Sequence, residues 1–355
     1  MCVFIYLLFF DRHLGYNIFN EFSYFLRRYI HMILSNEALA SLLTGAIRTE
    51  SEPHGLRPWR FSQSHMERMQ PNEAYCLRAE ASSGMTLDFE TNSRALEFDI
   101  VSKPAAGTPW YGLDITVNGR LAYHKLNKSG DTVSNVKVSL PEETSHVKFY
   151  LPNLCSVRLS KFTLDDGSFV RPVPQKSKLL FIGDSITQGY TTEHPSFSLV
   201  SRLCDALDAE CLNQAIGGAT YNADQLDAEN GYQPDLIFAS YGTNDWSLKQ
   251  DLTENASRWF ERLHKLYGNT PVCVLLPIWR PNIALREADG CEPFLQAREK
   301  ITAVCSRYPN CHVIDTFDFV PHDTAFFHDH VHPNEAGFEK YASAVLKAVQ
   351  ELRLL

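Results

Sequence analysis

The sequence predicts an α/β protein in which a parallel sheet flanked by helices follows an antiparallel β-sandwich of the jelly-roll kind. Apolar and polar residues alternate through most of residues 56–170, as in strands with one buried face. From residue 178 to the C-terminus, uncharged apolar runs alternate with helical stretches, which is typical of a parallel sheet with crossover helices. The polar, proline-rich residues 171–177 lie between the two patterns and form the expected linker.

Composition narrows the class of protein. A chain of 355 residues is long enough for two domains, and 44% hydrophobic with 21% charged residues is ordinary for a globular protein. The net charge of -9, without any basic cluster longer than a pair, argues against a nucleic-acid partner. Nine cysteines without a C-x-x-C pair indicate reduced thiols and a cytoplasmic location.

The N-terminal residues 1–31 form an extension of uncertain status. The apolar run from Val3 to Phe10 is about half the length needed to cross a bilayer, and neither a basic n-region nor a cleavage site accompanies it. We therefore expect no stable membrane span. Met32 makes a more natural start, which suggests an upstream translation extension or an uncleaved anchor.

Residues 32–55 are expected to hold a short helix, because Ser35 is a good N-cap and Gly45 a good terminator. In the following β-region, Asn118-Gly119 is a strong hairpin signal. The expected strands of the sandwich are 85–89, 96–100, 113–117, 136–140 and 157–162. The second domain, residues 178–355, has expected strands at 179–182, 211–213, 236–240, 272–276 and 312–315, and expected helices near 196–207, 253–266, 293–307 and 334–352.

The tripeptide Gly183-Asp184-Ser185 ends the first buried strand of the second domain. Ser185 would project from the carboxyl end of a central strand, where open α/β sheets place their chemistry. The simpler alternative is a turn in which Ser185 caps a helix. Asp329 lies three residues before His332, so these two residues offer a general base and a carboxylate to orient it.

A nucleophilic serine also needs hydrogen-bond donors for the oxyanion. The loop from Asn213 to Thr220 contains Gly217-Gly218 and offers backbone N–H groups. A second loop, Gly242-Thr243-Asn244-Asp245, follows another buried strand and offers the Asn244 amide.

These four segments, in this order, resemble the conserved blocks of the SGNH/GDSL hydrolase superfamily. The resemblance covers about residues 178–355 and implies a three-layer α/β/α domain that works without a cofactor or metal. It also implies that Ser185 is the nucleophile, His332 the base and Asp329 its orienting acid. The Ser185 N–H, Gly218 and Asn244 would form the oxyanion hole. The G-x-S-x-G elbow of α/β-hydrolases is absent, because Thr187 replaces its second glycine.

The N-terminal β-region resembles the sandwich that precedes the catalytic domain of some SGNH carbohydrate esterases. The expected activity is therefore hydrolysis of a small acyl ester, above all an acetyl ester, on a carbohydrate or other small molecule. Tyr190, Trp246 and Trp279 follow strand ends near the proposed site and are candidates for substrate binding.

Two other functions stay open from the sequence. His328, His330 and His332 have the right chemistry for a metal-dependent hydrolase, although no further ligand motif stands out. A glycan-binding protein with a relic hydrolase domain is the second alternative. The acyl chain length, the alcohol, the balance of hydrolysis and transfer, and the oligomeric state are left open.

Overall fold

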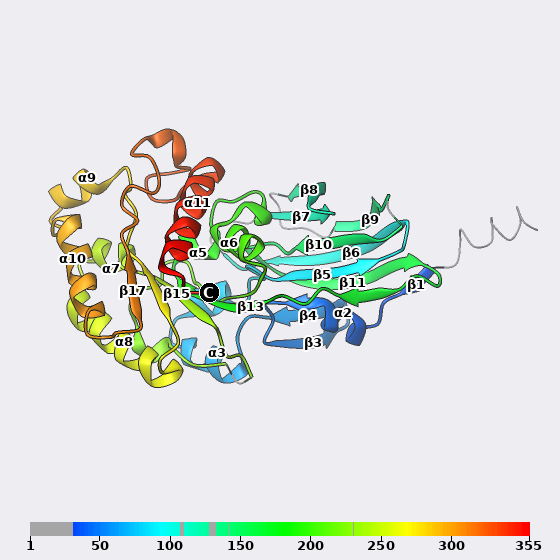
Figure 1. The fold of residues 1–355 in the computed structure, drawn as a ribbon, viewed down its shortest axis with the longest axis horizontal. Coiled ribbons are helices and arrows are strands. Elements are labelled where there is room, and N and C mark those ends of the chain that lie inside the picture. Colours follow the sequence, from blue (N-terminus) through cyan, green and yellow to red (C-terminus); the bar gives the residue numbers. More distant parts are fainter. Residues whose placement is uncertain (1–30, 107–109, 128–132, 142, 230) are drawn as a thin grey trace, which may run out of the picture.

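The computed structural model describes residues 31–106, 110–127, 133–141, 143–229 and 231–355. The N-terminal extension expected from the sequence lies outside these ranges except for His31. Figure 1 shows two antiparallel sheets in one half of the molecule and a parallel sheet covered by helices in the other. The predicted fold class, an SGNH-type α/β domain after an antiparallel β-sandwich, is confirmed.

The sandwich consists of two sheets. The first has the strand order β3-β4-β11-β6-β9, and β1 pairs with β11 at its side. The second has the strand order β12-β5-β10-β7-β8, and β2 pairs with β5. Its strands are β1 (His31–Ile33), β2 (Leu43–Thr44), β3 (Arg48–Glu52), β4 (Gly55–Trp59), β5 (Thr86–Thr91), β6 (Ala95–Pro104), β7 (Tyr111–Val117), β8 (Arg120–Asn127), β9 (Val133–Ser139), β10 (Ser145–Tyr150), β11 (Cys155–Asp165) and β12 (Val170–Pro172). Asn118 and Gly119 turn β7 into β8 with positive φ angles of 50° and 75°, as a type I′ hairpin requires.

Three short helices accompany the sandwich strands. The helix expected after Ser35 is α2 (Asn36–Leu42), whose N-terminus the Ser35 side chain caps. Two more, α3 (Gln63–Met69) and α4 (Glu73–Ala79), lie within residues 56–170, which the sequence predicted to be a β-sandwich without helices. Their caps, Ser62 and Asn72, each accept a backbone N–H three residues ahead, and the buried Met69 and Ala79 pack into the core of the parallel-sheet half.

The second half of the molecule is built on a five-stranded parallel sheet of order β14-β13-β15-β16-β17. Its strands are β13 (Ser177–Gly183), β14 (Ala209–Asn213), β15 (Leu236–Ser240), β16 (Val272–Leu275) and β17 (Cys311–Ile314). Its helices are α5 (Ser185–Gln188), α6 (Leu199–Leu207), α7 (Thr243–Ser247), α8 (Leu252–Tyr267), α9 (Ile283–Ala288), α10 (Phe294–Cys305) and α11 (Glu335–Leu352), with 3-10 turns η1 (Pro195–Phe197), η2 (Ala223–Gln225) and η3 (Thr324–Phe326).

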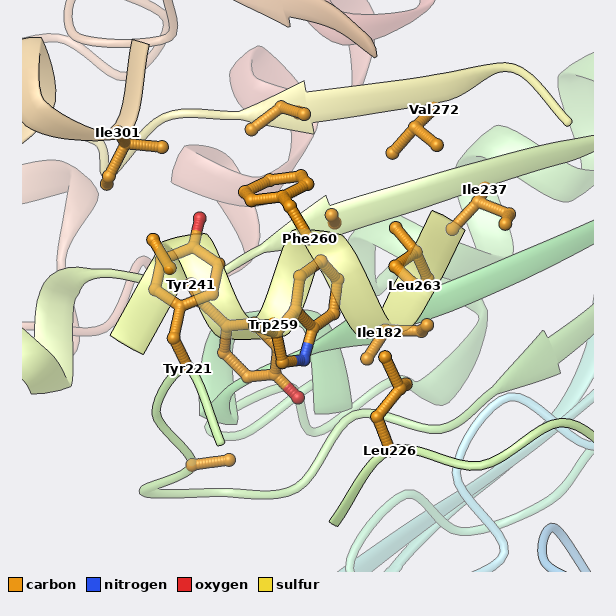
Figure 2. Close-up of a cluster of buried hydrophobic side chains, with 14 of the residues drawn as sticks. Ile182, Tyr221, Leu226, Ile237, Tyr241, Trp259, Phe260, Leu263, Val272 and Ile301 are labelled. Atoms are coloured by element: carbon orange, nitrogen blue, oxygen red, sulfur yellow. The ribbon is translucent and has the colours of Figure 1, made fainter. Parts of the chain in front are cut away.

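The strands of this sheet are apolar on both faces because each face is covered by helices. Phe181 and Phe238 stack at 4.6 Å on the face that α6 and α11 cover. On the other face, Trp259 and Phe260 of α8 pack with Tyr221 and other buried side chains (Figure 2). The helix α10 covers the same face.

The strand order fixes where a site can form. The chain passes from β13 to β14 on one side and then to β15 on the other, so the strand order reverses at β13, and open α/β sheets bind ligands at the carboxyl end of such a strand. Gly183 ends this strand, and a Cβ there would lie 2.6 Å from Thr187 Oγ1 and 2.9 Å from the Ser240 carbonyl oxygen. Glycine therefore lets the next residues turn sharply at this strand end.

Polar side-chain contacts join the sandwich to the parallel-sheet half. Lys148 and Tyr150 of β10 both bond the Asp205 carboxylate of α6, at 2.7 and 2.8 Å. Gly112 of β7 lies so close to the Glu193 carbonyl oxygen that a Cβ would overlap it. The two halves therefore pack with their backbones in direct contact.

Within the described ranges, we find no helix with the length and apolar character that a bilayer span requires.

Candidate active site

Ser185 is the first residue of α5, directly beyond β13. Asp184 caps this helix by accepting the Ile186 N–H at 3.0 Å, and Gly189 ends it in the left-handed conformation. The Ser185 Oγ lies 2.8 Å from His332 Nε2. A helix does begin at this turn, but its N-cap is Asp184 and not Ser185. The Ser185 hydroxyl instead contacts the imidazole.

The loop between η3 and α11 holds His332 in place. Its Nδ1 lies 2.8 Å from Asp329 Oδ2, and Asp329 Oδ1 accepts the backbone N–H groups of Val331 and His332, both at 2.7 Å. A bridge between Phe327 and Pro333 closes the base of the loop. Hydrogen bonds from the His332 ring and from its backbone N–H to Asp329 therefore fix the position of the imidazole.

The Asp329 carboxylate is stabilised in its charged form. Partial burial would raise its pKa, but hydrogen bonds from the His332 ring and backbone, together with the charge of that imidazole when protonated, hold the pKa well below its usual range. Asp329 is thus an anion at neutral pH and can fix the His332 tautomer in which Nε2 accepts the serine proton.

The expected oxyanion donors meet at the same sheet edge. A Cβ on Gly217 would lie 3.6 Å from the Ser185 Cβ, and Gly218 has a positive φ of 81°. The Asn244 amide donates one N–H to the Ala219 carbonyl at 2.9 Å. This bond fixes the Asn244 side chain beside the loop of residues 213–220, called the glycine loop below. The four sequence blocks are therefore brought together in space.

Four residues that the sequence analysis did not single out support this loop. Gln188 accepts the Gly217 N–H at 2.7 Å, and Arg78 of α4 donates to the Gly217 carbonyl at 2.6 Å. The Tyr75 hydroxyl donates to the Gly218 carbonyl at 2.8 Å. Arg60 is fully buried and donates to the carbonyls of residues 213 and 215, and its desolvation lowers its pKa to about 9. Single arginines and a tyrosine in a β-type region carry no sequence signal for this role.

Buried ionisable side chains surround Ser185. Burial raises the pKa of Asp184 to about 6, although the Ile186 N–H and the neighbouring His332 and Arg280 lower it. Asp245, one residue after Asn244, is also shifted to a pKa of about 6 by burial. The Arg280 guanidinium, with its pKa lowered to about 10 by burial, interacts electrostatically with Asp184.

Arg280 also positions the segment that carries Asn244. It donates to the Thr243 hydroxyl at 2.8 Å and to the Ser247 hydroxyl at 2.7 Å, which ties both ends of α7 to the segment after β16. No sequence pattern marks Arg280, whereas its neighbour Trp279 is a candidate for substrate binding.

The three aromatic residues proposed for substrate binding have different surroundings. The Tyr190 ring lies 4.6 Å from the His332 ring and is partly exposed. Trp279 is also partly exposed and stacks on His322 at 4.7 Å. Trp246 is 2% exposed, packs on Phe294 and donates its indole N–H to the carbonyl of residue 292. Because the Trp246 side chain is buried and its N–H is already hydrogen-bonded, it offers a substrate almost no surface. Trp246 therefore belongs to the core and not to the expected substrate-binding surface.

The histidine cluster has no shared metal geometry. His332 uses its two ring nitrogens on Ser185 and Asp329, whereas His328 and His330 are exposed. His328 instead packs edge-on against Trp110 at 5.8 Å. The metal-dependent alternative from this cluster is therefore not supported, because within the described part of the chain these residues do not bring three ligand atoms within 4.8 Å of one another.

Comparison with known proteins agrees with this geometry. Residues 181–340 match the model of the GDSL-like Lipase/Acylhydrolase family. This part of the chain is therefore a domain of the GDSL/SGNH acylhydrolase family, as its four blocks suggested. No curated protein matches the chain by sequence.

Solved structures match over nearly the whole chain. A salicylyl-acyltransferase, SsfX3, from a tetracycline biosynthetic pathway is 22% identical with a TM-score of 0.76, covering 92% of this chain and 98% of its own. A family two carbohydrate esterase from Clostridium thermocellum in complex with cellohexaose is 17% identical with a TM-score of 0.63, covering 88% and 100%. An acetyl xylan esterase from the rumen bacterium Butyrivibrio proteoclasticus is 14% identical with a TM-score of 0.61, covering 92% and 99%. At these identities the matches establish the shared fold of both halves. Together with the family match, they support an esterase or an acyltransferase.

Proposed function

We propose that this protein is a serine esterase that removes a small acyl group, with acetyl foremost, from a carbohydrate ester. The observation that carries the proposal is the continuous hydrogen-bonded series from Ser185 Oγ through His332 to Asp329, with both links at 2.8 Å. The sandwich that precedes the family domain, and the esterase structures that share it, support a carbohydrate as the alcohol component.

In the proposed reaction, Ser185 Oγ attacks the ester carbonyl while His332 Nε2 takes its proton. Asp329 keeps the imidazole oriented and stabilises its protonated form. The Ser185 and Gly218 N–H groups and the Asn244 amide donate to the oxyanion, each worth about two to three powers of ten in turnover. The protonated His332 then gives its proton to the departing alcohol, and a water activated by the same imidazole hydrolyses the acyl-enzyme.

Acyl transfer is the second candidate. It shares the acyl-enzyme and differs only in the acceptor, an alcohol in place of water. The observation that favours it is the TM-score of 0.76 to a salicylyl-acyltransferase.

The experiment compares the wild type with Ser185→Ala on p-nitrophenyl acetate, butyrate and octanoate and on acetylated xylo- and gluco-oligosaccharides. We expect serine-dependent acetate release, fastest on the sugars, and labelling of Ser185 by a fluorophosphonate. Full activity in Ser185→Ala would refute the mechanism. No labelling and no turnover would favour the relic glycan-binding protein, and product formation that grows with added acceptor alcohol would identify a transferase.

We also propose a cytoplasmic location, supported by free thiols at all eight cysteines within the described ranges. Fractionation of cells that express the full chain tests this proposal.

A further inference from the structure

A second cluster of chemically active side chains lies where the sandwich meets the segment after the nucleophile helix. Asp114 of β7 is fully buried, His124 lies opposite it on β8, and His194 precedes η1. Asp114 Oδ1 is 2.7 Å from His124 Nδ1 and 3.0 Å from His194 Nδ1. Among the residues that the structure describes, this group brings three atoms that can bind a metal, one carboxylate oxygen and two imidazole nitrogens, within 4.8 Å of one another.

We propose that Asp114, His124 and His194 bind a zinc ion that fastens the segment after the nucleophile helix to the sandwich. Two imidazole nitrogens and one carboxylate oxygen form a ligand set that suits zinc, with bonds of about 2.0–2.2 Å. In a tetrahedral site of that size the ligand atoms are roughly 3.3 Å apart, so the contacts of 2.7 and 3.0 Å at Asp114 would have to open by about 0.6 and about 0.3 Å.

The surroundings of Asp114 favour an ion over a simple pair of hydrogen bonds. Its second oxygen, Oδ2, accepts the Ser196 N–H at 3.1 Å and the Ser196 hydroxyl, which orients Oδ1 toward the two imidazoles. Metal-bound carboxylates are usually held by such outer hydrogen bonds. The rings of His124 and His194 stack at 3.7 Å, with both Nδ1 atoms directed at one oxygen.

The site is open on one side. The His124 and His194 side chains are 27% and 22% exposed, whereas the Asp114 side chain is fully covered. A water on the exposed side would complete four-coordination. Because His194 also donates its backbone N–H to Glu335 Oε1 at 2.9 Å, the ion would fix a segment that contacts the first turn of α11, three residues after His332.

The test separates metal ligation from hydrogen bonding. His124→Asn places an amide N–H near the position of Nδ1, so it keeps a donor to Asp114 but removes the nitrogen ligand. His194→Asn does the same on the other side. The matched control is His146→Ala, because His146 also bonds a buried aspartate, Asp88, at 2.5 Å but lacks a second imidazole there.

Each full-length protein is stripped with a chelator, incubated with zinc, gel-filtered and analysed for metal. We expect one zinc ion per chain in the wild type and in His146→Ala, a loss of at least tenfold in affinity in both asparagine variants, and a higher unfolding temperature with zinc only where it binds. No zinc in the wild type, or equal zinc in all four proteins, would overturn the proposal.

Cobalt substitution gives a second measurement on the wild type, which is independent of how well the variants fold. A nitrogen and oxygen ligand set gives weak visible bands without a thiolate charge-transfer band. Strong thiolate charge transfer would place the metal on cysteines and also refute the site.

Discussion

Asp329 is the most accessible part of the hydrogen-bonded series at the site: its side chain is 41% exposed, against 16% for His332. Its pKa lies well below the usual range, because the hydrogen bonds from His332 outweigh partial burial. It therefore stays ionised over the whole range of ordinary assays, and its titration should not shape the pH dependence of turnover above about pH 4.

We expect both Asp329→Asn and Ser185→Ala to lower kcat. The loss in Asp329→Asn should be smaller than the loss in Ser185→Ala by one to two powers of ten. The variant loses the negative charge that stabilises protonated His332, but the nucleophile, the base and the oxyanion donors remain. Turnover of p-nitrophenyl acetate by both variants measures the difference, with circular dichroism to check folding. Equal losses would mean that the carboxylate is as essential as the serine itself.

At the scale of elements, the short helix α5 is capped by a carboxylate that burial disfavours. The pKa of Asp184 is raised to about 6, above the ordinary value of about 3.9 expected in the unfolded chain. A raised pKa in the folded state means that the native protein holds this proton more tightly. Stability from the protonated form is therefore present below about pH 4 and is lost as the pH rises to about 6.

We expect Asp184→Asn to stabilise the protein above pH 6, by up to about 3 kcal/mol, while the gain shrinks toward pH 4. The asparagine still offers an oxygen to the Ile186 N–H but carries no charge. Urea unfolding of both proteins at several pH values measures the difference, in which the contribution of Asp329 largely cancels. A difference that does not change with pH would contradict the argument, and Asp184→Ala should lose the cap at every pH.

The glycine loop is a second element whose support can be tested. We expect Arg78→Met to lower kcat about tenfold with little change in KM, because the Gly217 carbonyl loses its 2.6 Å donor and the adjacent N–H groups lose their orientation. The matched control is Arg68→Met on α3, which removes only a partly exposed ion pair with Asp227. Equal effects of the two variants would assign Arg78 a general stabilising role.

Elements differ in how well the sequence predicts them. Strands such as β13 and β15 are recognisable because both faces are buried, so their residues are continuously apolar. The pair Asp329 and His332 is recognisable because its spacing is local. By contrast, Arg60 reaches the glycine loop from about 150 residues away, and no local pattern marks it. Trp246 illustrates the reverse error, since its position after a strand end suggested a pocket although its side chain packs inward.

At the scale of the whole molecule, the proposed site is supported by contacts between the two halves. Arg60 and Arg78, which hold the glycine loop, come from the N-terminal half, whereas Ser185 and His332 come from the other. Asp114 of the sandwich likewise holds His194 and Ser196, which follow the nucleophile helix. The N-terminal half therefore contacts both the glycine loop and the segment after α5.

Gly112 allows a direct test of this coupling. A methyl group there would overlap the Glu193 carbonyl, so we expect Gly112→Ala to push away the segment after the nucleophile helix. The unfolding free energy should fall by about 1–3 kcal/mol from overpacking, and kcat should fall with it. The control is Gly119→Ala in the β7–β8 hairpin, where nothing lies within 4 Å and only the positive φ is strained. It should cost a similar free energy and leave kcat unchanged, because the hairpin strain stays within the sandwich. An unchanged kcat in Gly112→Ala would instead mean that a displacement at the sandwich does not change the arrangement of the residues at the site.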